Sequence, residues 1–277
     1  MIGMAVIEAD YPLYFDAMNE YGLAAAGLNF PGNAWYDPQM RKDWQNISPF
    51  ELIPFVLGQC KNLKEARALL ERIHLVAIPF SEAMALSPLH WHFADEEGSI
   101  ALECTRAGMQ IHENPTGVLT NNPPFDYQLL HLSQYQQLSP LPPENHLSPE
   151  ASLPPYGRGM GAIGLPGDYS PASRFVRAAF LRAHSVYGQG TDSPLHQFFH
   201  LLEGVAMPRG GVVAENGRLA YTQYSCCMQK QGGIYYYKTY ENCRITAASL
   251  QKADVTGRSL IAYPRRREGP IDWENAT

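Results

Sequence analysis

An arginine at a predicted helix start is the residue whose setting first suggests chemistry. Asp168 and Ser170 are residue types that cap helix N-termini, Pro171 suits the first helical position, and apolar side chains recur at helical spacing over 175–183. This pattern places Arg174 in the first turn of an amphipathic helix. The helix dipole favours anions at that end, so the helix itself does not stabilise a cation there. Arg174 is therefore either a solvated surface residue or a cation that faces negative charge at a site.

The elements around Arg174 predict a layered α+β protein. Capping signals at Ser48 and Asn62 predict helices that end near residues 59 and 73, and Pro, Gly, Ser and Gln make 134–160 a protruding loop. Helices grouped between antiparallel strands favour layers over βαβ units. Two further helices are expected over 171–187 and 194–206, and strands over 1–9, 22–30, 90–95, 99–105, 219–229, 233–241 and 243–250.

Composition narrows the function classes. The 277 residues are 45% apolar, enough for one large core, and the formal net charge of −6 argues against nucleic acid and anionic membrane surfaces. No apolar run reaches the ~18 residues that span a bilayer, which favours a cytoplasmic protein. His196 and His200 lie one helical turn apart but lack the Glu of the H-E-x-x-H pattern, and the five cysteines include no C-x-x-C. We expect no metal and no cofactor.

Four ordered segments carry a resemblance to a known family: 18–34, 115–129, 165–175 and 222–245. The sequence resembles the choloylglycine hydrolases, the bile salt hydrolases and penicillin V acylases among the N-terminal-nucleophile hydrolases. The resemblance runs from Met1 to about Ala262 and implies a four-layer αββα sandwich of two antiparallel sheets between helix layers. It also implies amide hydrolysis by a cysteine nucleophile, with no metal and no cofactor.

The family's nucleophile is the cysteine that becomes the first residue of the mature chain, and its own α-amino group acts as base. The opening residues of this chain resemble a stretch that begins some way inside the family's domain. We therefore expect residues 1–277 to form a single domain that lacks roughly fifty N-terminal residues, among them the nucleophile and the first strands. None of the five cysteines has an α-amine beside it, and free cysteines usually pack as small hydrophobes.

The resemblance assigns three catalytic positions. Asn121 would give its side-chain amide, and Asn29 mainly its backbone N–H, to the oxygen that becomes negative in the tetrahedral intermediate. Both asparagines are predicted where a strand breaks into a Pro-containing turn. Arg174 aligns with the arginine beside the family's nucleophile, where a fixed cation favours thiolate over thiol.

The resemblance also suggests a substrate class. Asn29 within the sequence LNFPGNAWY looks like the bile salt hydrolase branch rather than the acylase branch. The segment 78–91 matches the family's pocket loop and offers Phe80, Met84 and Leu89 as large apolar side chains for a steroid acyl group. Ordinary core packing is the alternative for these three residues.

Three functional hypotheses stay open at this point. The chain is a bile salt hydrolase with a start codon placed too far downstream, a penicillin V acylase with the same mechanism and another acyl pocket, or an inactive truncated domain. The expected partner is a conjugated bile salt, with no nucleic acid and no membrane. Assembly into a homotetramer through the 134–160 loop is expected from the resemblance.

Overall fold

The structure is a computed structural model that describes residues 1–188 and 193–275. It divides into two compact units, one formed by Met1–Gly117 with Ala206–Thr277 and the other by Val118–Val205.

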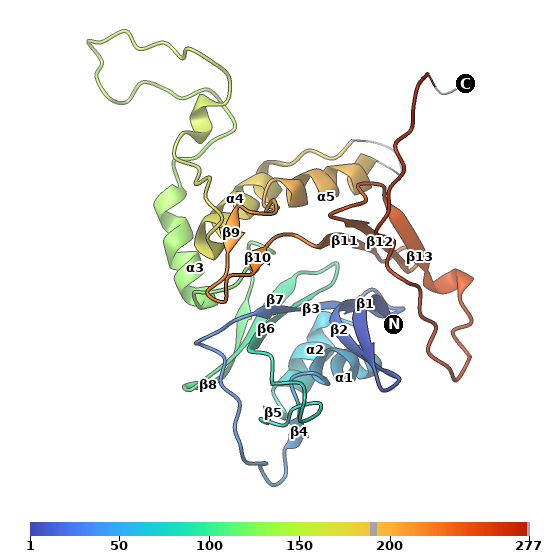
Figure 1. The fold of residues 1–277 in the computed structure, drawn as a ribbon. Coiled ribbons are helices and arrows are strands. Elements are labelled where there is room, and N and C mark those ends of the chain that lie inside the picture. Colours follow the sequence, from blue (N-terminus) through green and yellow to red (C-terminus); the bar gives the residue numbers. More distant parts are fainter. Residues whose placement is uncertain (189–192, 276–277) are drawn as a thin grey trace. The chain divides into compact units, whose positions relative to one another are not determined.

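An antiparallel sheet forms the centre of the first unit, in the spatial order β1-β2-β3-β6-β7-β8 (Figure 1). Trp91 and Phe93 alternate on β6 and are fully buried, as expected for a strand with one face against a core. The register pairs Gly27 with Trp91 and Asn29 with Leu89. The strands are β1 (Ile2–Glu8), β2 (Tyr11–Met18), β3 (Ala24–Asn29), β6 (Leu89–Ala94), β7 (Ser99–Thr105) and β8 (Gly108–Glu113).

Two helices pack with this sheet: α1 (Leu52–Gln59) contacts β2 and β3, and α2 (Leu63–Leu70) contacts α1. The helix that was expected to begin after Ser48 begins at Leu52, although Glu51 Oε2 accepts from the Ser48 N–H at 3.0 Å, as in a capping box. The next helix is capped by Asn62 as predicted but ends at Leu70. It is followed by β5 (Ile73–Leu75), which pairs in parallel with β4 (Gln45–Ile47), a strand that precedes both helices.

A second antiparallel sheet completes the first unit, in the order β11-β12-β13. A carboxylate ties it to the larger sheet: Tyr235 of β12 donates to Asp16 Oδ1 of β2 at 2.6 Å, and the Tyr224 hydroxyl of β11 donates to the other carboxylate oxygen. The strands are β11 (Tyr224–Gln229), β12 (Ile234–Thr239) and β13 (Thr246–Ser249), followed by η3 (Leu250–Lys252). A separate hairpin joins β9 (Val212–Val213) to β10 (Leu219–Ala220).

The second unit is helical. α3 (Phe125–Leu132) packs with α4 (Pro171–His184), and Phe125 meets Phe175 edge-on with ring centroids 6.2 Å apart. α5 (Ser193–Glu203) packs with α4. The residues between η1 (Ser133–Tyr135) and η2 (Met160–Ala162) form neither helix nor strand.

Two predictions about local structure are wrong. Strand β2 lies between the predicted strands 1–9 and 22–30 and was not itself predicted. Asn121 was expected at a strand end, but residues 115–121 are irregular. Asn29, by contrast, is the last residue of β3.

Candidate active site

A direct hydrogen bond joins two of the predicted catalytic residues in the second unit. Arg174 Nη2 donates to Asn121 Oδ1 at 2.7 Å. A guanidinium has donors and no acceptor, so this bond fixes the amide with its oxygen toward the arginine and its Nδ2 group at the opposite end. Both side chains are half-buried. The arginine therefore sets the orientation of the asparagine.

The segment that carries Asn121 is held by buried polar groups. Gln128 of α3 is fully buried, and its Nε2 donates to the carbonyls of Asn121 at 2.9 Å and Pro123 at 3.2 Å. Thr120 Oγ1 donates to the carbonyl of Pro171, the first residue of α4, at 2.9 Å. These bonds connect the Asn121 segment to the helix start that carries Arg174.

The start of α4 is built by the capping residues that the sequence showed. Ser170 Oγ accepts from the Ser173 N–H at 3.3 Å. Asp168 accepts from the Ser173 hydroxyl at 2.6 Å and from the Ser170 N–H at 2.9 Å. Hydrogen bonds from the side chains of Ser170 and Ser173, together with the Ser170 N–H, lower the pKa of the Asp168 carboxyl to about 2. Arg174 Nε donates to the Tyr169 carbonyl at 3.1 Å, so the guanidinium is held at two points.

The charge of Arg174 is only partly compensated within its own unit. Burial lowers the pKa of its guanidinium, and the neighbouring Arg177 lowers it further. Over residues 118–188 and 193–205, Arg174 forms no ion pair with a carboxylate; its bonds there go to an amide oxygen and a carbonyl. A half-buried cation held by neutral acceptors can stabilise an anion brought to it.

In the first unit, the other four predicted residues line one cavity of about 400 Å³: Asn29, Phe80, Met84 and Leu89. Phe80 stands in an aromatic cluster at its wall, edge-on to Phe50 at 5.2 Å and 5.7 Å from Tyr11 between ring centroids. Asn29 is exposed at the end of β3, while the other three are partly buried. The volume and the apolar lining suit a small ligand with an apolar body.

Four of the five cysteines lie in environments that disfavour a thiolate. Burial raises the pKa of the Cys60, Cys104 and Cys227 thiols to about 11. Burial and the nearby Asp16 raise the pKa of Cys226 well above its usual value, and Cys243 is an exposed free cysteine. A thiol must be deprotonated to attack, and these environments favour the protonated form.

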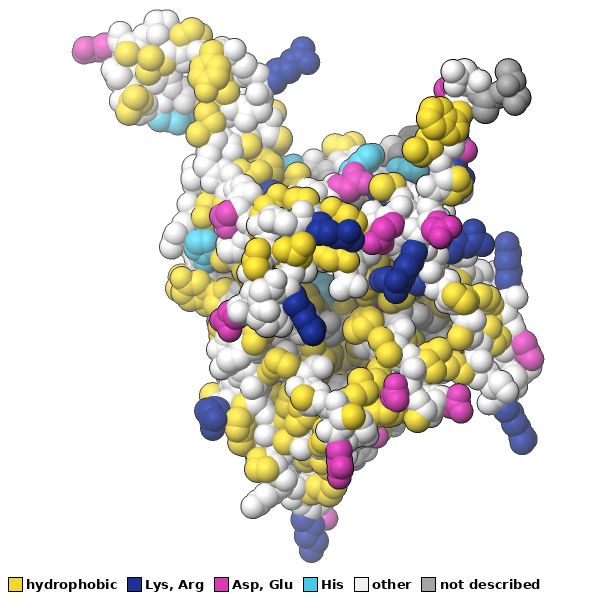
Figure 2. Space-filling view, viewed as in Figure 1, with side chains coloured by type: hydrophobic (Ala, Val, Ile, Leu, Met, Phe, Trp, Pro, Cys, Tyr) yellow, Lys and Arg dark blue, Asp and Glu magenta, His cyan; other side chains and the backbone are white. Residues whose placement is uncertain are grey.

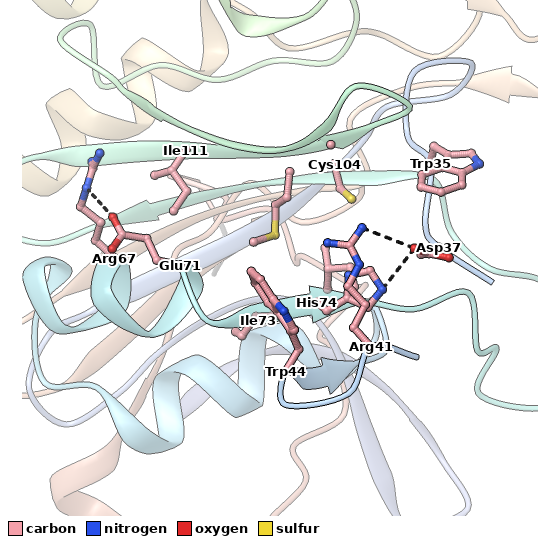
Figure 3. A pocket seen from close by; sticks show the side chains of 13 residues that line it. Trp35, Asp37, Arg41, Trp44, Arg67, Glu71, Ile73, His74, Cys104 and Ile111 are labelled. Carbon is pink, nitrogen blue, oxygen red and sulfur yellow. Dashed lines mark ion pairs between the residues drawn. The ribbon is translucent and has the colours of Figure 1, made fainter. Parts of the chain in front are cut away.

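Cys104 lines a second cavity, of about 420 Å³, between α2, β5 and β8 (Figure 3). Its charged groups pair with one another: Asp37 is 3.5 Å from the Arg41 guanidinium and 3.4 Å from His74 Nε2. Arg67 lies 3.6 Å from Glu71 at the other end. The charges of this cavity are therefore compensated from within.

Four residues of these sites were not found from the sequence: Thr120, Gln128, Gly27 and Trp91. The first two hold the segments of Asn121 and Arg174 in place, and the last two line the apolar cavity. The register of β3 on β6 places Gly27 opposite Trp91, and a pairing signal between the two strands would have been needed to find them.

Across the part of the chain that the structure describes, the charged groups of the surface and the remaining side chains add no further site. On the face shown in Figure 2, basic and acidic side chains are interspersed rather than gathered by sign. Within the described residues, no group of three or more His, Cys, Asp or Glu side chains could hold a metal ion, and no helix has both the length and the apolar character to cross a membrane.

The sequence and the fold are similar to those of known proteins. Residues 1–263 match the family described as linear amide C–N hydrolases, choloylglycine hydrolase family. A bile salt hydrolase/transferase of Lactiplantibacillus plantarum is 47% identical over 268 residues, which cover 97% of this chain and 82% of the relative.

Two solved structures are also similar. A variant of the conjugated bile acid hydrolase of Clostridium perfringens superimposes with a TM-score of 0.91 at 38% identity, covering 99% of this chain and 84% of that one. The penicillin V acylase of Agrobacterium tumefaciens gives a TM-score of 0.68 at 22% identity, covering 87% and 67%. These likenesses confirm the predicted α+β fold of the N-terminal-nucleophile hydrolase type.

Proposed function

Because the chain belongs to the choloylglycine hydrolase family of linear amide C–N hydrolases, we propose that it provides the scaffold of a bile salt hydrolase. The reaction is cleavage of the amide in glycine- or taurine-conjugated bile salts by acyl transfer through a cysteine. The observation that carries the proposal is the hydrogen bond between Arg174 and Asn121, which joins a half-buried cation to an oriented amide donor.

The pair suits two steps of such a reaction. The Nδ2 group of Asn121 donates to the oxygen that becomes negative in the tetrahedral intermediate, and the backbone N–H of Asn29 is its proposed second donor. Arg174 lowers the pKa of the attacking thiol, since a nearby cation favours thiolate. Arg174 also keeps Asn121 from rotating its acceptor oxygen toward the oxyanion, because that oxygen accepts from the guanidinium.

The cavity beside Asn29 is the proposed site for the acyl group. A steroid is rigid and apolar, and Phe80, Met84 and Leu89 offer the large hydrophobic side chains that would surround it. Asn29, rather than an aromatic residue, favours bile salts over penicillin V at this position.

The nucleophile is not among the five cysteines of residues 1–277, on our proposal. Four of these thiols have raised pKa values, and none can use its own α-amine as base. The 277 residues alone are therefore inactive in deconjugation, and activity needs a segment that starts with a cysteine.

The experiment compares two proteins on three substrates. One is the 277-residue chain, and the other is the same chain joined to the nucleophile-bearing N-terminal segment of a bile salt hydrolase. We expect the joined protein to release glycine or taurine from glycocholate or taurocholate, and to act on penicillin V much more slowly. Preference for penicillin V would assign the acylase function instead, and no turnover of any amide would contradict both.

The proposal also includes a cytoplasmic location and assembly into a homotetramer through the 134–160 loop. Support comes from four large apolar side chains of this loop that are exposed: Leu141, Leu147, Leu153 and Tyr156, the last to 89% of its surface. Exposed apolar groups gathered on one segment are typical of protein contacts. Light scattering should show a smaller assembly when Leu147 and Tyr156 are both replaced by Ser, and an unchanged mass would exclude this loop from the interface.

A further inference from the structure

The apolar cavity contains a buried donor that has no partner. Trp91 is fully buried, lines the cavity, and its indole Nε1–H makes no hydrogen bond. Buried N–H groups in native proteins are nearly always paired, because an unpaired one loses its bonds to water without replacement. Such a group inside a binding cavity points to a ligand that completes it.

The strand register places Trp91 beside Gly27 at the wall of the cavity. Gly27 of β3 faces Trp91 of β6, and both line the same space. A Cβ atom at residue 27 would lie 3.4 Å from Trp91 Nε1 and 3.5 Å from its Cδ1. Glycine therefore places no side chain against the N–H edge of the indole, where the Cβ of any larger residue would lie in contact with it.

The lining determines what kind of acceptor fits. No Lys, Arg, His, Asp or Glu side chain is among the residues that line this cavity, which all lie in the described part of the chain. A charged oxygen would have no counter-ion there and would be costly to bury. A hydroxyl or oxo oxygen carried on an apolar body suits a single neutral donor.

We propose that Trp91 is a specificity-determining residue whose indole N–H binds an oxygen substituent on the apolar body of the acyl group. This rests on the proposed function, because it takes the cavity as the acyl site. The consequence is a preference for ring systems that carry a hydroxyl or oxo group over the same ring systems without one. Gly27 contributes to this preference because it places no side chain against the donor.

The first test observes the donor itself in the 277-residue chain, without the need for turnover. The sequence has four tryptophans, so isotope labelling of the indoles gives four N–H resonances in a proton–nitrogen NMR spectrum, and Trp91→Phe identifies the one of Trp91. Cholate and cholanate, the same ring system without hydroxyl groups, are added below their aggregation concentrations. We expect a downfield shift of the Trp91 indole proton with cholate and not with cholanate.

The second test measures affinity by calorimetry in three variants. Trp91→Phe removes the donor and keeps most of the ring, and we expect it to weaken cholate binding roughly fivefold to tenfold, as for loss of one neutral hydrogen bond, with little change for cholanate. Because Trp91 lies in the core, Gly27→Ala serves as a second variant that covers the donor and should act in the same direction. Trp44→Phe is the matched control, since Trp44 lines the other cavity and should leave both affinities unchanged.

The outcomes separate this inference from the function on which it rests. Equal losses for cholate and cholanate in Trp91→Phe and Gly27→Ala, or an indole resonance that responds alike to both ligands, would overturn the role of Trp91 and leave the bile salt proposal standing. If the wild-type chain binds neither cholate nor cholanate, the proposal that this cavity holds a steroid acyl group is wrong, and the role of Trp91 is wrong with it.

Discussion

Our proposal gives the Arg174 guanidinium two roles, which separate variants can distinguish. Its Nη2 orients the Asn121 amide at 2.7 Å, and its charge acts on the proposed nucleophile. A neutral replacement that still donates hydrogen bonds keeps part of the first task and loses the second. Replacement of Arg174 should therefore shift the pH–rate profile, whereas replacement of Asn121 should not.

Asn121→Ala should lower kcat roughly 10²–10³-fold with little change in KM, in the chain joined to a nucleophile-bearing segment. The reason is that the amide's bond to the substrate oxygen strengthens only as negative charge develops. Steady-state kinetics on glycocholate measure both constants. Asn122→Ala is the matched control, the same residue type one position along, and should lose far less. A kcat close to that of the wild type in Asn121→Ala would show that Asn121 is only a structural residue of a turn.

Arg174→Gln should raise the pKa of the nucleophile and move the rising limb of the pH–rate profile toward alkaline pH by about one unit or more. Removing the cation removes stabilisation of the thiolate, so activity is lost first at low pH. Arg174→Lys should rescue in part, because an ammonium lacks the planar fork that holds Asn121 and Tyr169 together. Arg182→Gln, a charge change in the last turn of α4, should leave the profile unmoved. An unmoved profile in Arg174→Gln would contradict the electrostatic role.

The residues that we propose as catalytic could be found from the sequence, and those that hold them in place could not. Arg174 could be placed from Ser170 and Pro171, because helix caps are local signals. Gln128 contacts Asn121 from another helix, and nothing in its own neighbourhood distinguishes it from a surface glutamine. Burial of such a side chain is a tertiary property, which local patterns do not contain.

Among the elements, the link between β2 and the β11-β12-β13 sheet has a measurable pH dependence. Asp16 is 5% exposed and accepts from the hydroxyls of Tyr224 and Tyr235, while Cys226 lies beside it. Burial raises the pKa of its carboxyl more than these hydrogen bonds lower it. The folded protein therefore binds a proton at Asp16 more tightly than the unfolded chain does.

Stability from Asp16 should be fully present below its unfolded pKa of about 4 and be lost as pH rises through its raised folded pKa. Asp16→Asn has no such proton, so the stability of the wild type should fall relative to this variant, by at most about 1.4 kcal/mol per pH unit. Urea unfolding of both proteins between acidic and neutral pH measures the difference. A difference that stays constant, or that changes in the opposite direction, would contradict a raised pKa.

Boundaries of elements show where local signals fail. Asn62 caps α2 as predicted, yet the helix ends at Leu70 because Ile73–Leu75 pairs with Gln45–Ile47 as a strand. Helix α1 begins at Leu52, later than predicted, although Glu51 accepts the expected hydrogen bond from the Ser48 N–H. Strand pairing follows directly on the end of α2, and the capping residues indicated only the approximate positions of both helices.

For the whole molecule, the α+β class followed from the order of helices and strands, and the family followed from four separate segments. The match over residues 1–263 and the TM-score of 0.91 with the Clostridium perfringens structure confirm both. Strand order could not be derived in the same way. β3 pairs with β6 across about sixty residues that hold two helices and the β4-β5 pair, and such long-range pairing depends on shared burial rather than on a turn sequence.

The remaining prediction concerns the 277-residue chain by itself. It should show no detectable deconjugation of glycocholate or taurocholate. On our proposal these residues supply oxyanion donors without a nucleophile, and such donors leave only a small residual rate, on the order of 10³-fold over water in comparable enzymes. Cys104→Ala and Cys226→Ala should change nothing, since both thiols have raised pKa values. Release of glycine or taurine, measured with a ninhydrin assay, checks this. Turnover that either substitution abolishes would show that an internal cysteine attacks the amide, and the raised pKa of that thiol would then have to fall when substrate binds.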